Sequence, residues 1–351
     1  MKNSVSTLIF TAMITTTTTF RPCNAQNPAW LKMVEYAAKA PSGHNTQPWI
    51  FVLKSDAIEI HPDFGQALPV VDGSNRELYI SLGAAAANLQ IAAAAAGYKS
   101  DCSIKRDALK GDAYIRVNLE KGDVAQSVLF EQIDKRQTNR SIYKGHDLAE
   151  DTLQQLKNVA VDPGVAMRFF GRESDAFQIL RGYVALGNKM QMEDKAFKNE
   201  LIEWIRFNKW QKNSLKNGLT YEVMGTPSIP SFLGKPIVKS QLTPRKQNKA
   251  DMEKIDSSSQ LVLFTVKENN PEQWVRLGMT LERFLLEATR LGIANAYLNQ
   301  PCEVNELTIK MQEDLQIKDE YAVLLLRLGY ADPLPYAPRK TVDEVVFVVG
   351  D

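Results

Sequence analysis

A long run of small and apolar residues, from Leu78 to Tyr98, constrains the fold more than any other segment of this chain. Its sequence is LYISLGAAAANLQIAAAAAGY, which leaves almost no polar face on any side of a helix. A helix that is apolar all round has to be covered by other elements, so the segment predicts a helix buried inside a domain. Gly97 is expected to end that helix, because glycine commonly follows the last helical turn.

A second apolar helix is predicted from Trp274 to Gly292, and it echoes the first one. Gly83 and Gly97 lie fourteen residues apart, and so do Gly278 and Gly292. Each pair brackets an apolar helix, although few other residues are identical. This repeated placement predicts two related α+β halves within one chain.

Shorter elements are predicted around these two helices from the spacing of apolar residues. A helix is expected over 28–40, a hairpin over 49–54 and 57–61, a helix over 127–136, and a long, interrupted helical region over 178–210. Strands are expected at 113–119, 165–170, 261–267, 294–299 and 322–330. Residues 212–258 are polar and rich in Gly, Pro, Ser and Lys. This segment is long for a connection, which favours a lid or binding loop over an inert linker.

The overall charge and hydropathy argue against two classes of protein. The 351 residues carry a formal charge of +1, whereas a nucleic-acid-binding chain usually has a basic field. No run of eighteen apolar residues exists, so no membrane span is predicted. The three cysteines and three histidines lack the spacing of a disulfide framework or a metal site. We therefore expect no metal.

The N-terminal segment has features of a secretory signal. Lys2 precedes a moderately apolar stretch, and Cys23-Asn24-Ala25 resembles a cleavage site after Ala25. We expect residues 1–25 to be removed and the mature protein to be exported to the periplasm. The alternative is a disordered tail on a cytoplasmic protein.

The most polar loop of the chain precedes the first predicted strand. Residues 40–50 are APSGHNTQPWI, in which Ser42, Asn45 and Gln47 offer hydrogen-bond donors and acceptors after Pro41 and Gly43. These side chains either grip a ligand with a polar edge or only form a local capped turn. His44 is expected to make a hydrogen bond or a packing contact, not to act as a base or ligand.

Three arginines are candidates for binding a phosphate. Arg136 and Arg140 flank Thr138 in the sequence RQTNR, and Arg339 follows a proline-rich turn near the end of the chain. Guanidinium groups match phosphate oxygens in pairs, and a threonine hydroxyl adds a donor. The alternative is a solvated basic turn and a surface pair. Signatures of Rossmann, P-loop, α/β-hydrolase and zinc-protease sites are missing.

These segments together resemble the FMN-dependent nitroreductase family. The loop APSGHNTQPW is similar to that family's APSxxNxQPW loop, and RQTNR is similar to its Arg-x-Ser-x-Arg phosphate motif, with threonine for serine. Residues 274–301 and 329–346 resemble its central helix and closing segment. The order of the motifs is that of the double-length, Acg-like branch, in which one chain plays both subunits of the usual homodimer.

The resemblance implies an α+β, nitroreductase-like fold with two pseudo-symmetric halves. These would cover 26–125 and 126–351, with an insertion at about 200–250 in the second. It implies FMN as cofactor, a monomer that mimics a dimer, and no protein catalytic residue, because the flavin carries the chemistry. Arg136, Thr138, Arg140 and Arg339 would hold the phosphate, and Pro41, Ser42, Gly43 and Asn45 would line the isoalloxazine.

The turn at Leu298, Asn299 and Gln300 would lie near flavin N5 in this resemblance. The acidic residue and glycine that the family often has at this turn are absent here, which puts the usual N5 contact in doubt.

The implied function is two-electron transfer through FMN from a small-molecule donor, such as NAD(P)H, to a nitroaromatic- or quinone-like acceptor. Trp204, Trp210, Tyr221 and Met224 in the insertion allow a different outcome. If they close permanently over the flavin, the protein would bind or store FMN with little turnover. A cofactor-free interaction protein on the same fold is the remaining alternative.

Overall fold

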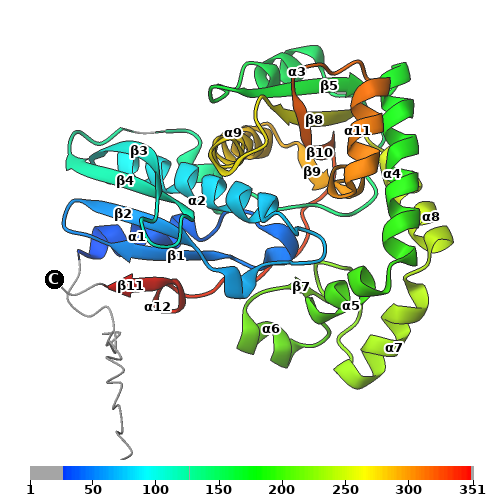
Figure 1. Cartoon of the computed structure of the whole chain (residues 1–351), viewed down its shortest axis with the longest axis horizontal. Coiled ribbons are helices and arrows are strands. Elements are labelled where there is room, and N and C mark those ends of the chain that lie inside the picture. Colours follow the sequence, from blue (N-terminus) through cyan, green and yellow to red (C-terminus); the bar gives the residue numbers. More distant parts are fainter. Residues whose placement is uncertain (1–26, 126, 349–351) are drawn as a thin grey trace, which may run out of the picture.

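The computed structural model describes residues 27–125 and 127–348. The predicted signal peptide, residues 1–25, lies outside the described residues, so its cleavage and the export of the chain stay predictions. The described chain is a mixture of helices and mainly antiparallel sheets, which confirms the predicted α+β class. Figure 1 shows two main sheets with helices between and beside them.

The first sheet is made mainly by the N-terminal third of the chain. Its strands lie in the order β11-β1-β2-β4-β3. They are β1 (Trp49–Leu53), β2 (Ala57–Pro62), β3 (Tyr98–Arg106), β4 (Ala113–Lys121) and β11 (Val346–Val348). The hairpin of β1 and β2 is the predicted one, whereas β3 and β11 were missed. Because β11 pairs in parallel with β1, the last described residues lie on the first sheet, although the predicted division placed them with the second half.

The second sheet comes from the rest of the chain. Its strands lie in the order β5-β8-β10-β9, all antiparallel. They are β5 (Val165–Gly171), β8 (Gln260–Val266), β9 (Ala294–Tyr297) and β10 (Tyr321–Gly329), close to the predicted ranges. A short parallel pair, β6 (Ile205–Arg206) and β7 (Leu219–Thr220), lies apart from both sheets.

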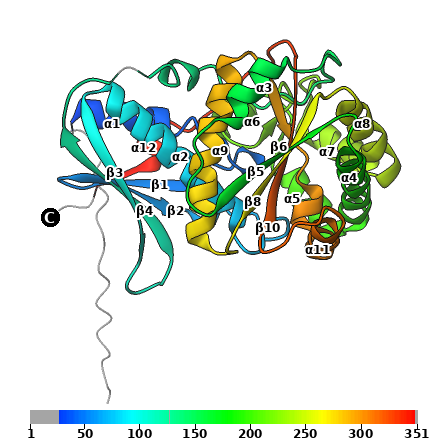
Figure 2. The ribbon, with the colours of Figure 1, turned by 90° about the horizontal axis from the view of Figure 1, so that it is seen from above.

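Two long helices cross between the sheets, α2 (Arg76–Ala95) and α9 (Pro271–Arg290) (Figures 1 and 2). The first glycine of each repeated pair, Gly83 in α2 and Gly278 in α9, lies where the two helices touch. A Cβ on Gly83 would lie 2.0 Å from the carbonyl oxygen of Val275, and one on Gly278 would lie 2.0 Å from that of Ile80. Any larger residue would therefore force the backbones apart. The echo thus marks where the two helices touch.

The predicted buried character of α2 is confirmed. Fourteen of its residues are buried, and the helix belongs to the main hydrophobic core. By length and composition α2 is the one described helix that could cross a membrane, but 78% of its apolar window is covered by the rest of the protein. Its apolar surface is used for packing in the core.

The remaining helices cover the sheets and build the insertion. They are α1 (Pro28–Ala37), α3 (Glu150–Lys157), α4 (Asp175–Glu193), α5 (Lys195–Glu203), α6 (Lys209–Leu215), α7 (Ser231–Gln241), α8 (Pro244–Asp256), α10 (Gln300–Glu303), α11 (Asn305–Asp314) and α12 (Val342–Val345), with 3₁₀ turns η1 (Gly43–Asn45), η2 (Phe64–Gln66) and η3 (Phe130–Gln132). The long helical region predicted over 178–210 is interrupted at Asp194, which caps α5.

Two predictions of local structure were wrong. The helix expected over 127–136 is reduced to the single turn η3, because the chain bends to bury Arg136 against Glu282 of α9. The segment 212–258, expected as a polar loop, is largely the helices α7 and α8. Their few buried residues gave little apolar periodicity to detect: Gly234 in α7, and Asp251 and Ile255 in α8.

Candidate functional site

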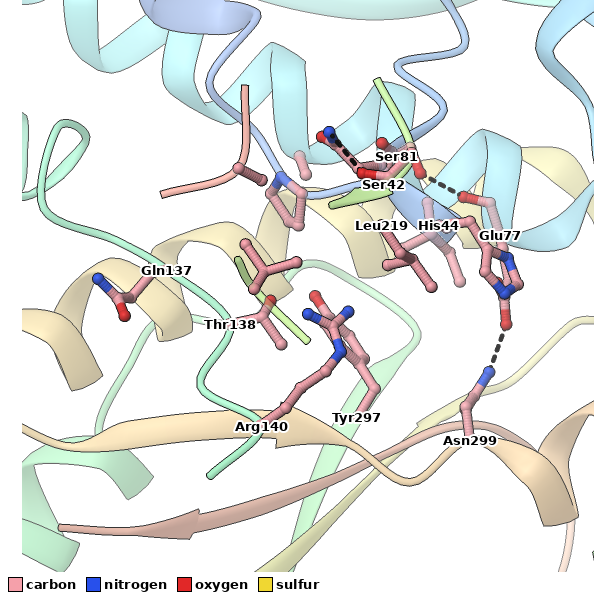
Figure 3. A pocket seen from close by; sticks show the side chains of 18 of the residues that line it. Ser42, His44, Glu77, Ser81, Gln137, Thr138, Arg140, Leu219, Tyr297 and Asn299 are labelled. Atoms are coloured by element: carbon pink, nitrogen blue, oxygen red, sulfur yellow. Dashed lines mark hydrogen bonds between the residues drawn. The ribbon is translucent and has the colours of Figure 1, made fainter. Parts of the chain in front are cut away.

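A cavity of about 530 Å³ lies where the two halves of the chain meet (Figure 3). Ten of the eleven residues predicted to bind a cofactor line it: Pro41, Ser42, Gly43, Asn45, Arg136, Thr138, Arg140, Asn299, Gln300 and Arg339. Leu298 does not, because its side chain is buried in a neighbouring core cluster. Segments separated by up to about 300 residues in sequence therefore form one cavity.

The polar loop is held in an unusual backbone conformation beside this cavity. His44, Asn45 and Gln47 all have positive φ, between 47° and 57°, which costs a non-glycine residue roughly 1–3 kcal/mol each. Hydrogen bonds from distant segments hold it in place. The Gln47 side chain donates to the Lys216 carbonyl at 2.8 Å and accepts from the Lys340 amide at 2.8 Å. The loop therefore forms a capped turn and also lines the cavity, and whether it grips a ligand stays a prediction.

Asn45 lines the cavity, but its side chain also makes hydrogen bonds to other segments of the chain. Its Nδ2 donates to the carbonyls of Gly218 and Pro338, and its Oδ1 accepts from Arg339 Nη1 at 2.8 Å. The side chain therefore orients Arg339 and joins the loop to the insertion. Few of its hydrogen-bonding positions remain for a ligand.

The first end of the cavity is cationic and is built around Arg136 and Arg339. Arg136 Nη2 and Arg339 Nη2 both donate to the Lys39 carbonyl, at 3.1 and 3.2 Å. The counter-charge is Glu282, whose Oε1 lies 3.4 Å from Arg136 Nε. The side chains of Arg136 and Glu282 are at most 2% exposed. Two guanidinium groups thus share one buried carboxylate.

Several buried N–H groups at this end make no hydrogen bond with any described residue, although one of them lies within ion-pair distance of Glu282. These are Nε and Nη1 of Arg136 and Nε of Arg339. Burial and the nearby Arg136 lower the pKa of Arg339 to about 9, and burial raises the pKa of Glu282. An anion that accepted hydrogen bonds from these N–H groups would balance the excess positive charge of the two guanidinium groups.

Most of the motif RQTNR lines the cavity, and two of its side chains also bind the chain itself. Thr138 and Arg140 line the cavity, and Arg140 makes no hydrogen bond or ion pair with any described residue. Figure 3 shows Arg140 next to Tyr297. Gln137 also borders the cavity. Its side-chain amide donates a hydrogen bond to the Leu334 carbonyl and accepts one from the Leu334 N–H. The motif therefore presents cations while fixing the closing segment of the chain.

The opposite end is acidic and was not predicted. Glu77 of α2 and Glu303 of α10 both line the cavity, and their carboxyl groups hydrogen-bond to each other. Two carboxyl groups can do so only when one is protonated, so the pair shares a proton. Burial, followed by the charge of Glu303, raises the pKa of Glu77 to about 8. Asn299 Nδ2 donates to Glu77, and Gln191 Nε2 donates to Glu303.

Two further features of the acidic end follow from close packing. A Cβ on Gly43 would lie 3.0 Å from Glu77 Oε2, so only glycine leaves this carboxyl group undisturbed. His44 Nδ1 is buried without a partner among the described residues, and burial followed by the charge of Arg140 lowers its pKa to about 4. His44 is therefore neutral at physiological pH.

The insertion and the helices that lead into it supply an apolar wall to the cavity. This wall consists of Met192, Phe197, Leu201, Leu219 and Val223, from α4, α5, β7 and the segment after it. The aromatic residues expected to close over the site are not among the lining residues. Trp210 is 72% exposed, which makes it a surface residue.

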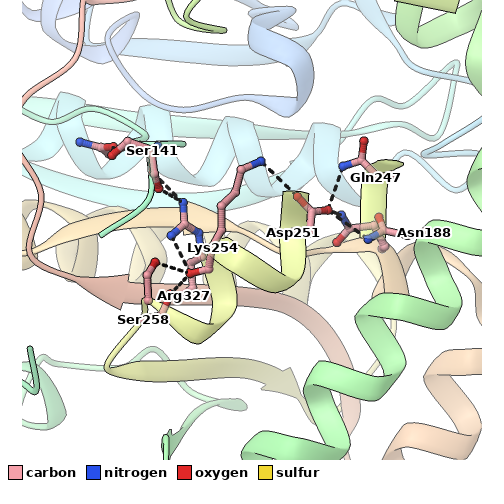
Figure 4. Close-up of polar contacts among 10 residues, drawn as sticks. Ser141, Asn188, Gln247, Asp251, Lys254, Ser258 and Arg327 are labelled. Atoms are coloured by element: carbon pink, nitrogen blue, oxygen red, sulfur yellow. Dashed lines mark hydrogen bonds and ion pairs between the residues drawn. The ribbon is translucent and has the colours of Figure 1, made fainter. Parts of the chain in front are cut away.

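A carboxylate network fastens the insertion next to the acidic end (Figure 4). Asp251 Oδ2 of α8 accepts from Asn188 Nδ2 at 3.1 Å, Gln247 Nε2 at 2.8 Å and Gln300 Nε2 at 3.2 Å. Its other oxygen lies 3.1 Å from Lys254 Nζ. Helices α4, α8 and α10 therefore meet at one buried acid.

The chain is similar to nitroreductases along most of its length, as its motifs predicted. No family model matches it. Two proteins of Mycobacterium tuberculosis (strain ATCC 25618 / H37Rv) carry the names "Putative NAD(P)H nitroreductase Rv3131" and "Putative NAD(P)H nitroreductase acg". Each is 24% identical to this chain, the first over 88% of both chains and the second over 90% of this chain and 94% of its own.

Solved structures with similar segments have low overall similarity. The FMN-dependent nitroreductase NfnB of Mycobacterium smegmatis, crystallised with NADPH, is 11% identical, with a TM-score of 0.40 over 62% of this chain and 96% of its own. Iodotyrosine deiodinase, bound to FMN and 3-iodo-L-tyrosine, is 14% identical, with a TM-score of 0.40 over 60% and 95%.

Proposed function

We propose that this chain binds FMN in the cavity and acts as a two-electron oxidoreductase on a small aromatic acceptor, such as a quinone or a nitroaromatic. The observation that carries the proposal is the pair Arg136 and Arg339, whose buried N–H groups without hydrogen-bond partners lie at one end of a cavity of suitable size. Pockets for small molecules and cofactors span about 300–1,000 Å³. The names of the M. tuberculosis relatives support the same class.

The residues of the cavity fit this cofactor. Arg136, Thr138, Arg140 and Arg339 would hold its phosphate, because guanidinium and hydroxyl donors stabilise a dianion. Pro41, Ser42 and Gly43 would line the ring system. When bound, FMN supplies reversible two-electron transfer at its N5 atom.

The chain's own contribution to the chemistry lies at the acidic end. Glu77 and Glu303 hold one proton between them at neutral pH, next to the amide of Asn299. A proton held there is available to an acceptor that gains negative charge, as general acids with raised pKa values provide. The wall of Met192, Phe197 and Leu201 keeps water away from that end.

Arg140→Ala tests the proposal most cleanly, because Arg140 contacts no described residue that its loss would leave unpaired. A charge-assisted hydrogen bond is worth about 1.5–3 kcal/mol, so the dissociation constant for FMN should rise roughly 10- to 100-fold with unchanged unfolding by urea. Fluorescence titration with FMN measures this. Arg245→Ala, which removes an exposed arginine outside the cavity, is the matched control. Equal FMN affinity in both variants would contradict the proposed phosphate site.

Absorbance of the loaded protein then tests turnover. Under anaerobic conditions, NADH or NADPH should bleach the flavin, and a quinone should restore its colour. The network at Asp251 supports the second candidate function, FMN binding with little turnover, because it ties the insertion to the site. A flavin that dithionite bleaches but that neither nicotinamide nor quinone affects would favour that candidate.

The one-chain arrangement also predicts a monomer. Both ends of the cavity come from the same chain, so no second copy is needed to complete the site. Light scattering that gave an obligate dimer would contradict this.

A further inference from the structure

Helix α7 presents an apolar face that no described part of the chain covers. Its inner side packs through Gly234 against Phe207, and through Val238 against the cluster of Ile202, Ile205 and Phe207. Its outer side carries Phe232, Leu233 and Ile237, which are 75%, 49% and 53% exposed. Leu233 and Ile237 are four residues apart and are therefore neighbours on one helix face, and Phe232, one residue before Leu233, extends the exposed apolar surface at its edge. Exposed apolar patches of this kind mark interaction surfaces.

The same region has a strong excess of positive charge. Residues 209–249 contain eight of the chain's 42 Lys and Arg but only one of its 41 Asp and Glu, Glu222. Glu222 already pairs with Lys212. Lys239, Arg245 and Lys249 are exposed and make no ion pair with any described residue. A chain of near-neutral total charge thus concentrates free cations in its exposed apolar helix and the helix that follows it: Lys239 lies in α7, and Arg245 and Lys249 lie in α8.

We propose that the outer face of α7, with Lys239, Arg245 and Lys249 beside it, docks on an anionic lipid surface. Apolar side chains entering the headgroup boundary and lysines contacting anionic headgroups are the two features that hold amphipathic helices in that plane. A second copy of the chain is disfavoured, because two such faces would bring like charges together. Nucleic acid would use the cations but would leave Phe232, Leu233 and Ile237 in water.

The position of α7 connects this surface to the cavity. Helix α5 contacts α7 through the ion pair of Glu203 with Lys235, and α5 also gives Phe197 and Leu201 to the cavity wall. Docking through α7 would bring the apolar wall of the cavity close to the lipid. A lipid-soluble acceptor, such as a long-chain quinone, would fit that placement. This last step rests on the proposed function, whereas docking itself does not.

The experiment is flotation of the full chain with lipid vesicles. The chain should bind vesicles made of phosphatidylglycerol and phosphatidylcholine in equal parts, and should bind vesicles of phosphatidylcholine alone at least tenfold more weakly. Added salt should weaken the binding, since exposed charges are screened. Binding to neither vesicle, or equal binding to both, would overturn the proposal.

Two sets of variants locate the surface. The triple variant Phe232→Gln, Leu233→Gln and Ile237→Gln should bind the anionic vesicles at least roughly tenfold more weakly than the parent. Its matched control is Leu109→Gln, Val128→Gln and Ile142→Gln, which changes three exposed apolar residues elsewhere and should bind like the parent. If the two triple variants bind equally, another segment docks and the proposal fails.

Charge reversal gives an independent measurement. Lys239→Glu with Arg245→Glu should abolish most of the anionic-vesicle binding, whereas Lys157→Glu with Lys310→Glu, at exposed sites outside the insertion, should not. Binding of all variants to FMN reports separately on the proposed function. Tight binding to single-stranded DNA without vesicle binding would overturn the proposal in favour of nucleic acid. Loss of a dimer in the α7 triple variant, again without vesicle binding, would overturn it in favour of a second copy.

Discussion

The two ends of the cavity carry opposite charge, and the chain stabilises them in different ways. At the acidic end, Glu77 and Glu303 share a proton and accept hydrogen bonds from side-chain amides, so their charge is largely neutralised within the protein. At the cationic end, Arg136 and Arg339 face the single carboxylate of Glu282 and keep buried N–H groups without hydrogen bonds. The acidic end is complete by itself, whereas the cationic end has capacity for an anion.

The largest expected effect comes from breaking the buried ion pair at the cationic end. Arg136→Met leaves Glu282 buried without its direct ion-pair partner, and removing one partner of a buried pair costs about 3 kcal/mol or more. Unfolding of the cofactor-free protein in urea measures this loss.

The second substitution separates charge from packing. Adding Glu282→Gln to Arg136→Met removes the stranded charge and should recover most of the stability, although FMN should still bind weakly. Arg245→Met, at an exposed position, should leave the free energy of unfolding unchanged. If Arg136→Met is as stable as the parent, the ion pair is not what holds this end of the cavity.

The cationic end was predictable from the sequence, and the acidic end was not. Arg136, Thr138, Arg140 and Arg339 stand in short motifs whose residue types match a phosphate. Glu77 lies in the first turn of α2 and Glu303 lies in α10, 226 residues apart, and neither belongs to a motif. Only the fold brings them into contact. The turn at 298–300 lacks the expected acid in sequence, yet Glu77 places one beside Asn299 in space.

The fold shows the same division: elements set by their own segment were predictable from the sequence, and elements that depend on distant segments were not. The core helices α2 and α9 and most strands follow from apolar composition or periodicity within each segment, because burial selects apolar residues along the segment itself. The strand β11 has only three residues, and its pairing with β1 depends on the return of a distant segment. Helices α7 and α8 have largely exposed surfaces, so their periodicity was weak.

A smaller effect is expected from Glu77→Gln at the acidic end. The folded protein keeps the Glu77 carboxyl protonated up to a pKa of about 8, whereas an unfolded chain ionises it near 4.5. The folded state therefore binds more protons between these values, and stability falls as pH rises from about 4.5 to 8. In the variant, the fall in the free energy of unfolding between pH 4.5 and 8 should be smaller than in the parent by roughly 1–2 kcal/mol, as measured by urea unfolding across that range. A parent whose stability is flat over the range would contradict the shared proton.

The smallest effect, of opposite sign, is expected from His44 beside the acidic end. Burial and Arg140 lower its pKa to about 4, against 6.5 in an unfolded chain. The unfolded state therefore binds more protons between pH 4 and 6.5, and stability falls as pH drops through this window. His44→Asn keeps a residue that tolerates the positive φ and should remove about 1 kcal/mol of that loss, by urea unfolding at pH 4.5 and 7. An unchanged difference between the two pH values would show that His44 takes up its proton in the folded state as readily as in water.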